Sequence, residues 1–162
     1  MKHTISVLFK NKFNAIPRMV GLFSGRGYSI DSISFGQGED PELTRATITT
    51  EGDEQIIEQI NKQLHKMVDV LKVIDLTYES FVERELALVK VTSTPATRSE
   101  IMQIADIFRS NIVDISAKTL TIEVTGKEDK VDAAIVMLEQ FGIREIARTG
   151  TVALKREYKG SA

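Results

Sequence analysis

The chain has 162 residues, no cysteine, a formal net charge of −2 and a pI of about 5.8. The lack of cysteine excludes disulfides, thiolate catalysis and thiolate metal sites, and the charge balance is unlike that of a nucleic-acid-binding domain. No apolar run approaches the roughly 18 residues that span a membrane, and the N-terminus lacks a signal-peptide core, so we expect a cytoplasmic protein.

The first half of the chain predicts the order strand, helix, strand, strand, helix, strand. Residues 3–10 alternate in the way that a strand does, and residues 14–25 place apolar side chains at helical spacing before a glycine-rich stop. The other predicted elements are strands at 29–37 and 43–50 joined by a turn at 38–42, a helix that begins at Gly52-Asp53, and a closing strand at 67–76.

The second half predicts the same order again. It begins with a strand at 83–91 and a loop at 93–99, and it ends with a strand and extension at 142–154. Between them lie a helix with Ile101, Ile104, Ala105 and Phe108 on one face, strands at 111–116 and 119–124, and a helix marked by Val131, Ala134, Ile135 and Leu138. Residues 78–81 are the expected linker, and the polar tail 155–162 is expected to fray.

Two βαββαβ units in tandem predict an α+β protein with two ferredoxin-like domains, at 1–77 and 82–162. Such a unit covers one sheet face with helices and leaves sheet edges exposed. Pairing the same edge of two chains would remove one exposed edge, so a homodimer with a continuous sheet is expected.

Residues suited to catalysis are scarce in both halves. His3 and His65 are the only histidines, and His65 lies on a helix between lysines, so we expect neither to act as a catalyst or metal ligand. The segment 23–29 is glycine-rich but lacks the Lys-Ser/Thr of a phosphate loop, which favours a helix end followed by a turn. The carboxylates of the 38–42 turn could bind a hard cation. A turn exposed to solvent is the favoured explanation for them. We therefore expect no enzyme.

The segment 11–19 has functional potential because it leads into the first helix. A helix N-terminus offers unpaired N–H groups and a positive dipole end, which together can hold a carboxylate. A small acidic ligand such as an amino acid could bind there. The alternative is an ordinary helix start with Asn14 as its N-cap.

Several motifs closely resemble the regulatory small subunit of acetolactate synthase, also called acetohydroxyacid synthase. The resemblance runs from His3 to Lys155, and the motifs that carry it are GLFSGRGYSIDSIS at 21–34, GDEQIIEQINKQLHKMVDVLKVIDL at 52–76, VERELALVKV at 82–91, DIFRSNIVDIS at 106–116, TLTIEVTG at 119–126 and GIREIARTGTVAL at 142–154. It implies that the first half is an ACT domain, which binds small ligands, and that the second half is the family's own C-terminal domain.

The resemblance also implies a function. The family's small subunit has no chemistry of its own; it binds and activates a catalytic large subunit, to which thiamine diphosphate, magnesium and FAD would belong. That enzyme condenses pyruvate with pyruvate or 2-oxobutyrate, the first common step to valine, leucine and isoleucine. Branched-chain amino acids, usually valine, bind between the ACT domains of a small-subunit dimer and confer feedback inhibition.

By this resemblance, the expected effector-binding residues are Asn11, Asn14, Ala15, Ile16, Ser29 and Ile30. In the family, the first loop of one protomer meets the second strand of the other. For contact with the catalytic subunit we expect residues that adjoin this site, namely Gln37, Glu39, Asp40 and Arg18.

The chain departs from the family pattern in this loop. The family usually reads Asn-x-x-Gly-[Ala/Val]-Leu-x-Arg, and here Asn14 replaces the glycine while Phe13 replaces a small residue or proline. Pro17 lies early in the helix, and Ser29 stands where the family usually has asparagine. Asparagine tolerates positive φ better than most residues, so we expect the turn to survive.

These departures give a hypothesis and an alternative. A buried ligand group without its partner costs about 1–3 kcal/mol, or roughly 5- to 150-fold in affinity. The hypothesis is therefore a weakened, altered or lost valine response with activation retained. The alternative is that Asn14 compensates for Ser29 across the pocket.

Other classes of protein fit less well. A stand-alone ACT sensor that regulates another enzyme or a transporter would use the same pocket. An RNA-binding ferredoxin-like domain would need exposed aromatic residues in a pattern that neither half contains. An independent enzyme would need an acid-base or nucleophile constellation, which is missing.

Overall fold

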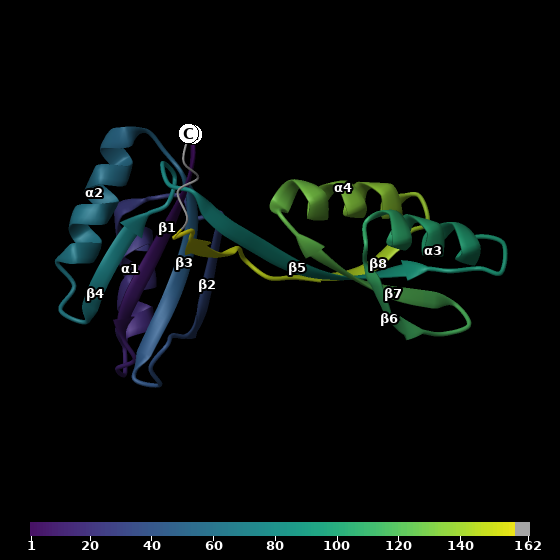
Figure 1. The fold of residues 1–162 in the computed structure, drawn as a ribbon, viewed down its shortest axis with the longest axis horizontal. Coiled ribbons are helices and arrows are strands. Elements are labelled where there is room, and N and C mark those ends of the chain that lie inside the picture. The colour runs from purple at the N-terminus through teal and green to yellow at the C-terminus, as the bar shows by residue number, and fades with distance from the viewer. Residues whose placement is uncertain (158–162) are drawn as a thin grey trace. The chain divides into compact units, whose positions relative to one another are not determined.

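The computed structural model describes residues 1–157, and Figure 1 traces their fold. The chain forms two compact units: Met1–Val82 together with the chain from Thr151 onward, and Glu83–Gly150. Within residues 1–157, no helix is long and apolar enough to cross a membrane. The domain boundaries predicted from the sequence, 1–77 and 82–162, stay a prediction that limited proteolysis would check.

The first unit confirms the predicted βαββαβ order. Its antiparallel sheet has the strand order β2-β3-β1-β4, so β2 and β4 form the edges. The elements are β1 (Lys2–Lys10), α1 (Ala15–Arg26), β2 (Ser32–Gln37), β3 (Leu43–Glu51), α2 (Glu54–His65) and β4 (Val70–Asp75).

Alternation along β1 decides which side of this sheet is the core. Ile5, Val7 and Phe9 are almost fully buried against helix residues such as Phe23 and Leu64. Asp53 caps α2, because its Oδ1 accepts a hydrogen bond from the N–H of Ile56 at 2.9 Å. Both helices therefore cover one face of the sheet (Figure 1).

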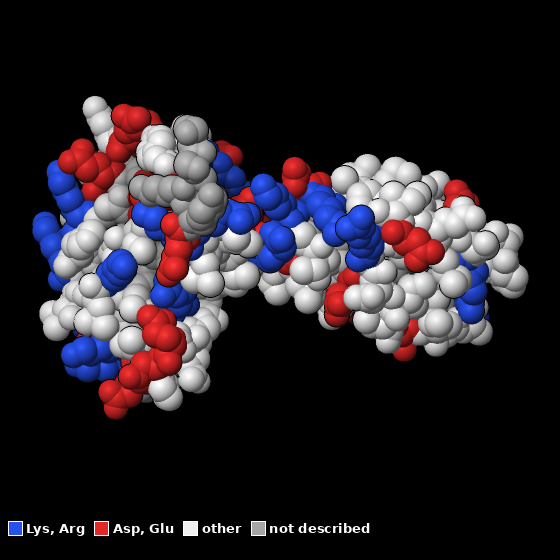
Figure 2. All heavy atoms as spheres, viewed as in Figure 1, with Lys and Arg blue, Asp and Glu red and all other residues white. Residues whose placement is uncertain are grey.

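The second unit repeats the arrangement, with strand order β6-β7-β5-β8. Figure 2 shows acidic and basic side chains interspersed on the visible surface of each unit. The elements are β5 (Phe81–Thr92), α3 (Arg98–Ile107), β6 (Asn111–Ile115), β7 (Thr119–Gly126), α4 (Glu128–Glu139) and β8 (Ile143–Arg148). Their core includes Val89, Val91, Ile101, Leu120, Ile122, Val131 and Leu138.

The predicted last strand at 142–154 is present, and its predicted extension proves to be a separate strand. The segment forms two strands, β8 and β9 (Val152–Lys155), and β9 pairs with β5, whose first residues belong to the first unit. The N–H of Thr151 donates to Ser32 Oγ at 3.3 Å, and Thr151 and Ala153 are buried. The break falls at the polar stretch 149–151, where Gly150 is the one local signal that a single strand does not continue.

Arg148 holds a buried carboxylate of the second unit. Its Nε and Nη2 lie 3.0 and 2.7 Å from Glu85 Oε2, and its Nη1 lies 2.6 Å from Asp132 Oδ1. Glu85 is only 6% exposed, whereas Arg148 is 30% exposed. Removing the guanidinium would therefore leave the buried Glu85 carboxylate without this charged partner, which is costly.

We expect Arg148→Met to lower the free energy of unfolding by about 2 kcal/mol, below the usual cost of breaking a fully buried pair because solvent reaches the arginine. Urea unfolding followed by circular dichroism measures the change. Arg84→Met is the matched control, since within residues 1–157 the exposed Arg84 guanidinium bonds just the neighbouring Glu83 carbonyl. Equal stability of the two variants would contradict this role for Arg148.

Candidate functional site

The loop from β1 to α1 turns at Asn14, which adopts the left-handed conformation with φ 73° and ψ 1°. This confirms the expectation that the turn survives the replacement of glycine. Asn14 occupies the N-cap position, but its side chain makes no capping hydrogen bond. The ordinary helix start with a side-chain cap is thus not what the structure shows, and the carboxamide is not held by the helix.

The first turn of α1 offers fewer free donors than a typical helix start. Ala15 N–H donates to the Lys12 carbonyl at 3.1 Å, Pro17 has no N–H, and Arg18 N–H donates to the Asn14 carbonyl at 3.1 Å. Among the described residues, Asn14 N–H and Ile16 N–H have no backbone acceptor. These two groups can receive a carboxylate oxygen.

Asp69 anchors the loop from the chain segment before β4. Its Oδ2 accepts a 2.6 Å hydrogen bond from Arg18 Nη2, and its Oδ1 lies 3.4 Å from Lys12 Nζ. Its carbonyl also accepts the Lys10 N–H at 2.9 Å. Asp69 is 4% exposed, so a buried carboxylate ties both sides of the turn together.

Sequence reasoning missed Asp69. The residue stands alone in the apolar stretch Met67–Leu71, and nothing local links it to a loop more than fifty residues earlier. A lone acidic residue in such a run is a signal for a buried partner, but the partner's identity depends on the fold. Arg18, expected at the surface that meets the catalytic subunit, is this partner.

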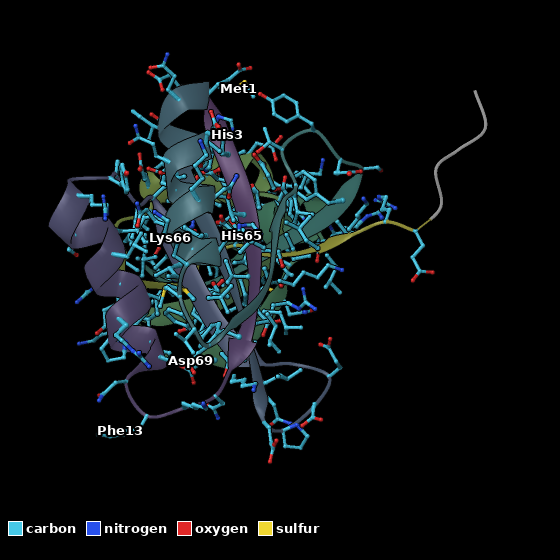
Figure 3. The ribbon with its side chains drawn as sticks, turned by 90° about the vertical axis from the view of Figure 1, so that its left-hand side faces the viewer. Met1, His3, Phe13, His65, Lys66 and Asp69 are labelled. Atoms are coloured by element: carbon cyan, nitrogen blue, oxygen red, sulfur yellow. The ribbon has the colours of Figure 1, made fainter. Side chains whose placement is uncertain are left out.

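The side chains at the loop divide into buried and exposed ones. Ala15 is 1% exposed and packs in the core, so a ligand at the loop would contact the residues beside Ala15 and not the Ala15 side chain. Ile16 is 37% exposed and Phe13 is 92% exposed. Figure 3 shows Phe13 projecting away from the fold at the end where Asp69 lies.

Ser29 and Ile30 lie at the opposite end of the sheet. Thr50 Oγ1 donates to the Ser29 carbonyl, and Thr50 pairs with His3 at the start of β1. The loop around Asn14 follows the other end of β1. Five residue steps from Ser32 to Gln37 already span about 17 Å, so one chain does not bring Ser29 to Asn14.

The β2–β3 turn, by contrast, lies beside the loop. Asn11 N–H donates to the Glu42 carbonyl at 2.7 Å, and Gln37 ends β2 at this end of the sheet. Asp40 Oδ1 accepts the Glu42 N–H at 2.8 Å, which shapes the turn, and Glu39 pairs with Arg45 at 3.4 Å. The turn that carries Glu39 and Asp40 therefore adjoins the loop, while the contact of Gln37, Glu39, Asp40 and Arg18 with a catalytic subunit stays a prediction.

The two histidines differ in their surroundings. His65 is exposed on α2, and its Nδ1 lies 2.8 Å from the Asn61 carbonyl. His3 is 1% exposed, with its Nδ1 3.1 Å from Thr77 Oγ1. Within residues 1–157, no three His, Asp or Glu side chains are placed to hold a metal ion.

Comparison with family models identifies both halves of the chain. Residues 5–72 match the AHAS small subunit-like ACT domain, and residues 84–157 match the small subunit of acetolactate synthase. The first match contains the whole of the Asn14 loop, its Asp69 anchor and all the residues predicted to bind the effector.

Whole-chain relatives agree with these matches. A probable acetolactate synthase small subunit of Archaeoglobus fulgidus is 49% identical over 159 residues, covering 98% of this chain and 99% of the relative. The acetolactate synthase small subunit of Bacillus subtilis is 45% identical over 158 residues, covering 96% and 91%. A crystal structure of the Thermotoga maritima small subunit has a TM-score of 0.91 at 42% identity, covering 98% of this chain and 99% of that one. This chain belongs to the family of acetolactate synthase small subunits, the non-catalytic regulatory subunits of that enzyme.

Proposed function

We propose that this chain binds and activates the thiamine-diphosphate-dependent catalytic subunit of acetolactate synthase and carries its branched-chain amino acid feedback, with a weakened response to valine. The observation that carries the feedback part is the β1–α1 loop. It presents Asn14 N–H and Ile16 N–H beside an unattached carboxamide, and Asp69 fixes its shape.

The effector site requires two copies of the chain. The outer edge of β2 pairs with no strand among residues 1–157, whereas its inner edge pairs with β3. If β2 pairs antiparallel with β2 of a second copy, the partner's Ser29 and Ile30 come to the end of the sheet that carries Asn14. A homodimer through this edge would therefore unite the two halves that a single chain keeps apart.

The proposed ligand contacts follow from this geometry. The amino acid's carboxylate would lie at the N–H groups of Asn14 and Ile16, with Asn11 at the rim and the partner's Ile30 against the side chain. Asn14 adds bulk where the family has glycine, and Ser29 is shorter than asparagine. Loss of one buried hydrogen bond corresponds to roughly 5- to 150-fold in affinity.

The control of activity is a coupling between two sites. Valine changes activity only by the difference in its affinity for the active and inhibited complexes. A typical coupling of about 1–3 kcal/mol allows partial as well as full inhibition. Weaker binding at the dimer interface therefore shifts the valine concentration needed without removing activation.

Acetolactate production by the cognate catalytic subunit, with and without this chain, tests the activation. We expect the chain to raise the rate and to co-purify with the catalytic subunit. Chain added after thermal unfolding is the control for non-specific protein effects. No rise in rate at a saturating excess of folded chain would overturn the proposal, whatever valine does.

A further inference from the structure

The sheet face opposite the helices of the first unit contains a second candidate site. A cavity of about 360 Å³ lies on this face, and residues 154–157, from the end of β9 and the two residues after it, form part of its lining. Its lining combines cationic side chains with an apolar floor: Ser6, Arg45, Lys72, Ile74, Leu76, Leu154, Lys155, Arg156 and Glu157.

Strand register places two of these cations in one row. Leu8 of β1 is opposite Arg45 of β3 on one side and opposite Lys72 of β4 on the other. In the next row on this face, Ser6 is opposite Ile74. The guanidinium and the ammonium therefore flank one end of the cavity, on strands that the ladder holds rigidly.

Four cations, Arg45, Lys72, Lys155 and Arg156, line the cavity, against three carboxylates: Glu157 in the lining, and Glu39 and Glu79 paired with lining residues. Glu39 Oε2 lies 3.4 Å from Arg45 Nη2, and Lys155 Nζ lies 2.7 Å from Glu79 Oε1. Lys72 has no hydrogen bond or ion pair with any residue from 1 to 157, although it lies within electrostatic range of Glu39. One cation in the Arg45–Lys72 row is thus available to an incoming anion.

Glu39 lies beside the cavity cations and feels both of them, although they are not the main cause of its shifted pKa. Its pKa is lowered, first by a hydrogen bond with its own backbone and then by Arg45 and Lys72. Glu39 is 62% exposed, so this carboxylate can swing into water and leave the guanidinium to a ligand. A second anion would compete with Glu39 for Arg45.

Part of the cavity lining is apolar, although Lys155, Arg156 and Glu157 line it as well. Ile74 and Leu154 line it, and Leu76 is fully buried beneath. Arg45 Nη1 donates to Ser6 Oγ at 3.0 Å, which fixes the guanidinium over the sheet. A purely inorganic anion would leave this apolar floor uncovered, whereas a short hydrocarbon chain would cover it.

We propose that this cavity binds a small organic monoanion, with its carboxylate at Arg45 and Lys72 and its short apolar chain over Ile74 and Leu154. The site lies on the sheet face opposite α1, so it is distinct from the amino acid site at the Asn14 loop. It requires no ammonium recognition, because its lining offers mainly cationic groups to the ligand head.

Chemical-shift titration of the ¹⁵N-labelled full chain tests the site directly. The probe is isovalerate, a branched monocarboxylate without an amino group, and the second arm uses inorganic phosphate. We expect isovalerate to shift the amides of Ser6, Arg45 and Lys72, and Arg45→Gln or Lys72→Gln to weaken its apparent Kd by about tenfold. Glu39→Gln should strengthen binding about threefold, because it removes the competing carboxylate.

Lys118→Gln is the matched control, since it removes one exposed positive charge in the second unit. Equal weakening in this control, unchanged Kd in Lys72→Gln, or absence of shifts at the three amides would overturn the site. Tighter binding of phosphate than of isovalerate would overturn the organic class of ligand. The measurement uses no catalytic subunit, so its outcome is separate from that of the activation assay.

Discussion

Asn14→Gly combined with Ser29→Asn is expected to lower the valine concentration for half-maximal inhibition of the complex by at least about tenfold. Glycine keeps the φ of 73° without a side chain at the ligand carboxylate. Asparagine at 29 reaches further than serine and can restore one hydrogen bond, and each such bond corresponds to about 1–3 kcal/mol. The measurement is acetolactate production across a valine titration, at a saturating concentration of each chain.

The strain released at Asn14 needs its own control. Arg109 also has a positive φ, of 51°, and lies in the second unit, so Arg109→Gly relieves a comparable backbone strain away from the loop. We expect this variant to leave the valine response unchanged. One outcome would refute the weakened response: the wild-type complex is already inhibited at low valine, and the double variant changes the valine concentration for half-maximal inhibition less than twofold. Asn14 would then compensate for Ser29.

Asp69→Asn is expected to raise the valine concentration for half-maximal inhibition by about tenfold while activation persists. The amide cannot hold Arg18 and Lys12 as the carboxylate does, at 2.6 and 3.4 Å. Both cations are more than half exposed and would regain water, so we expect a stability loss of only about 1–2 kcal/mol. The loop around Asn14 would then sample conformations that cannot bind the carboxylate.

Hydrogen exchange distinguishes this effect from general destabilisation. The amides of Asn14 and Ile16 should exchange faster in Asp69→Asn, whereas those of core residues such as Val7 should follow global stability alone. Glu58→Gln, which breaks the exposed Glu58–Lys62 pair on α2, is the control and should change neither exchange at the loop nor valine response. A normal valine response in Asp69→Asn would show that the anchor does not support effector binding.

The repeated βαββαβ order was predictable because its signals are local. Alternation in residues 3–10 and helical spacing around Ile60 and Leu64 report which side of each element is apolar, and those sides became the core. The survival of the turn at Asn14 was also predictable, since the conformational range of asparagine belongs to the residue itself.

Contacts between distant segments were not predictable in the same way. Residues 142–154 form two strands, because β8 and β9 each pair with a different part of β5, and this pairing is not written in the local sequence. Asp69 gave no sign of its partners Lys12 and Arg18. Nor did the sequence place Ser29 and Asn14 at opposite ends of one sheet.

The sequence by itself determined the family, the two α+β units, the scarcity of catalytic groups and the identity of the altered loop residues. These depend on residue type, short-range periodicity and motif, all of which are present in the linear chain. Only the tertiary structure decided that Asp69 fixes the loop, that Arg45 and Lys72 share a cavity, and that one chain keeps Asn14 and Ser29 at opposite ends of its sheet. Strand register and chain crossing control these contacts, because they bring together residues that the sequence separates.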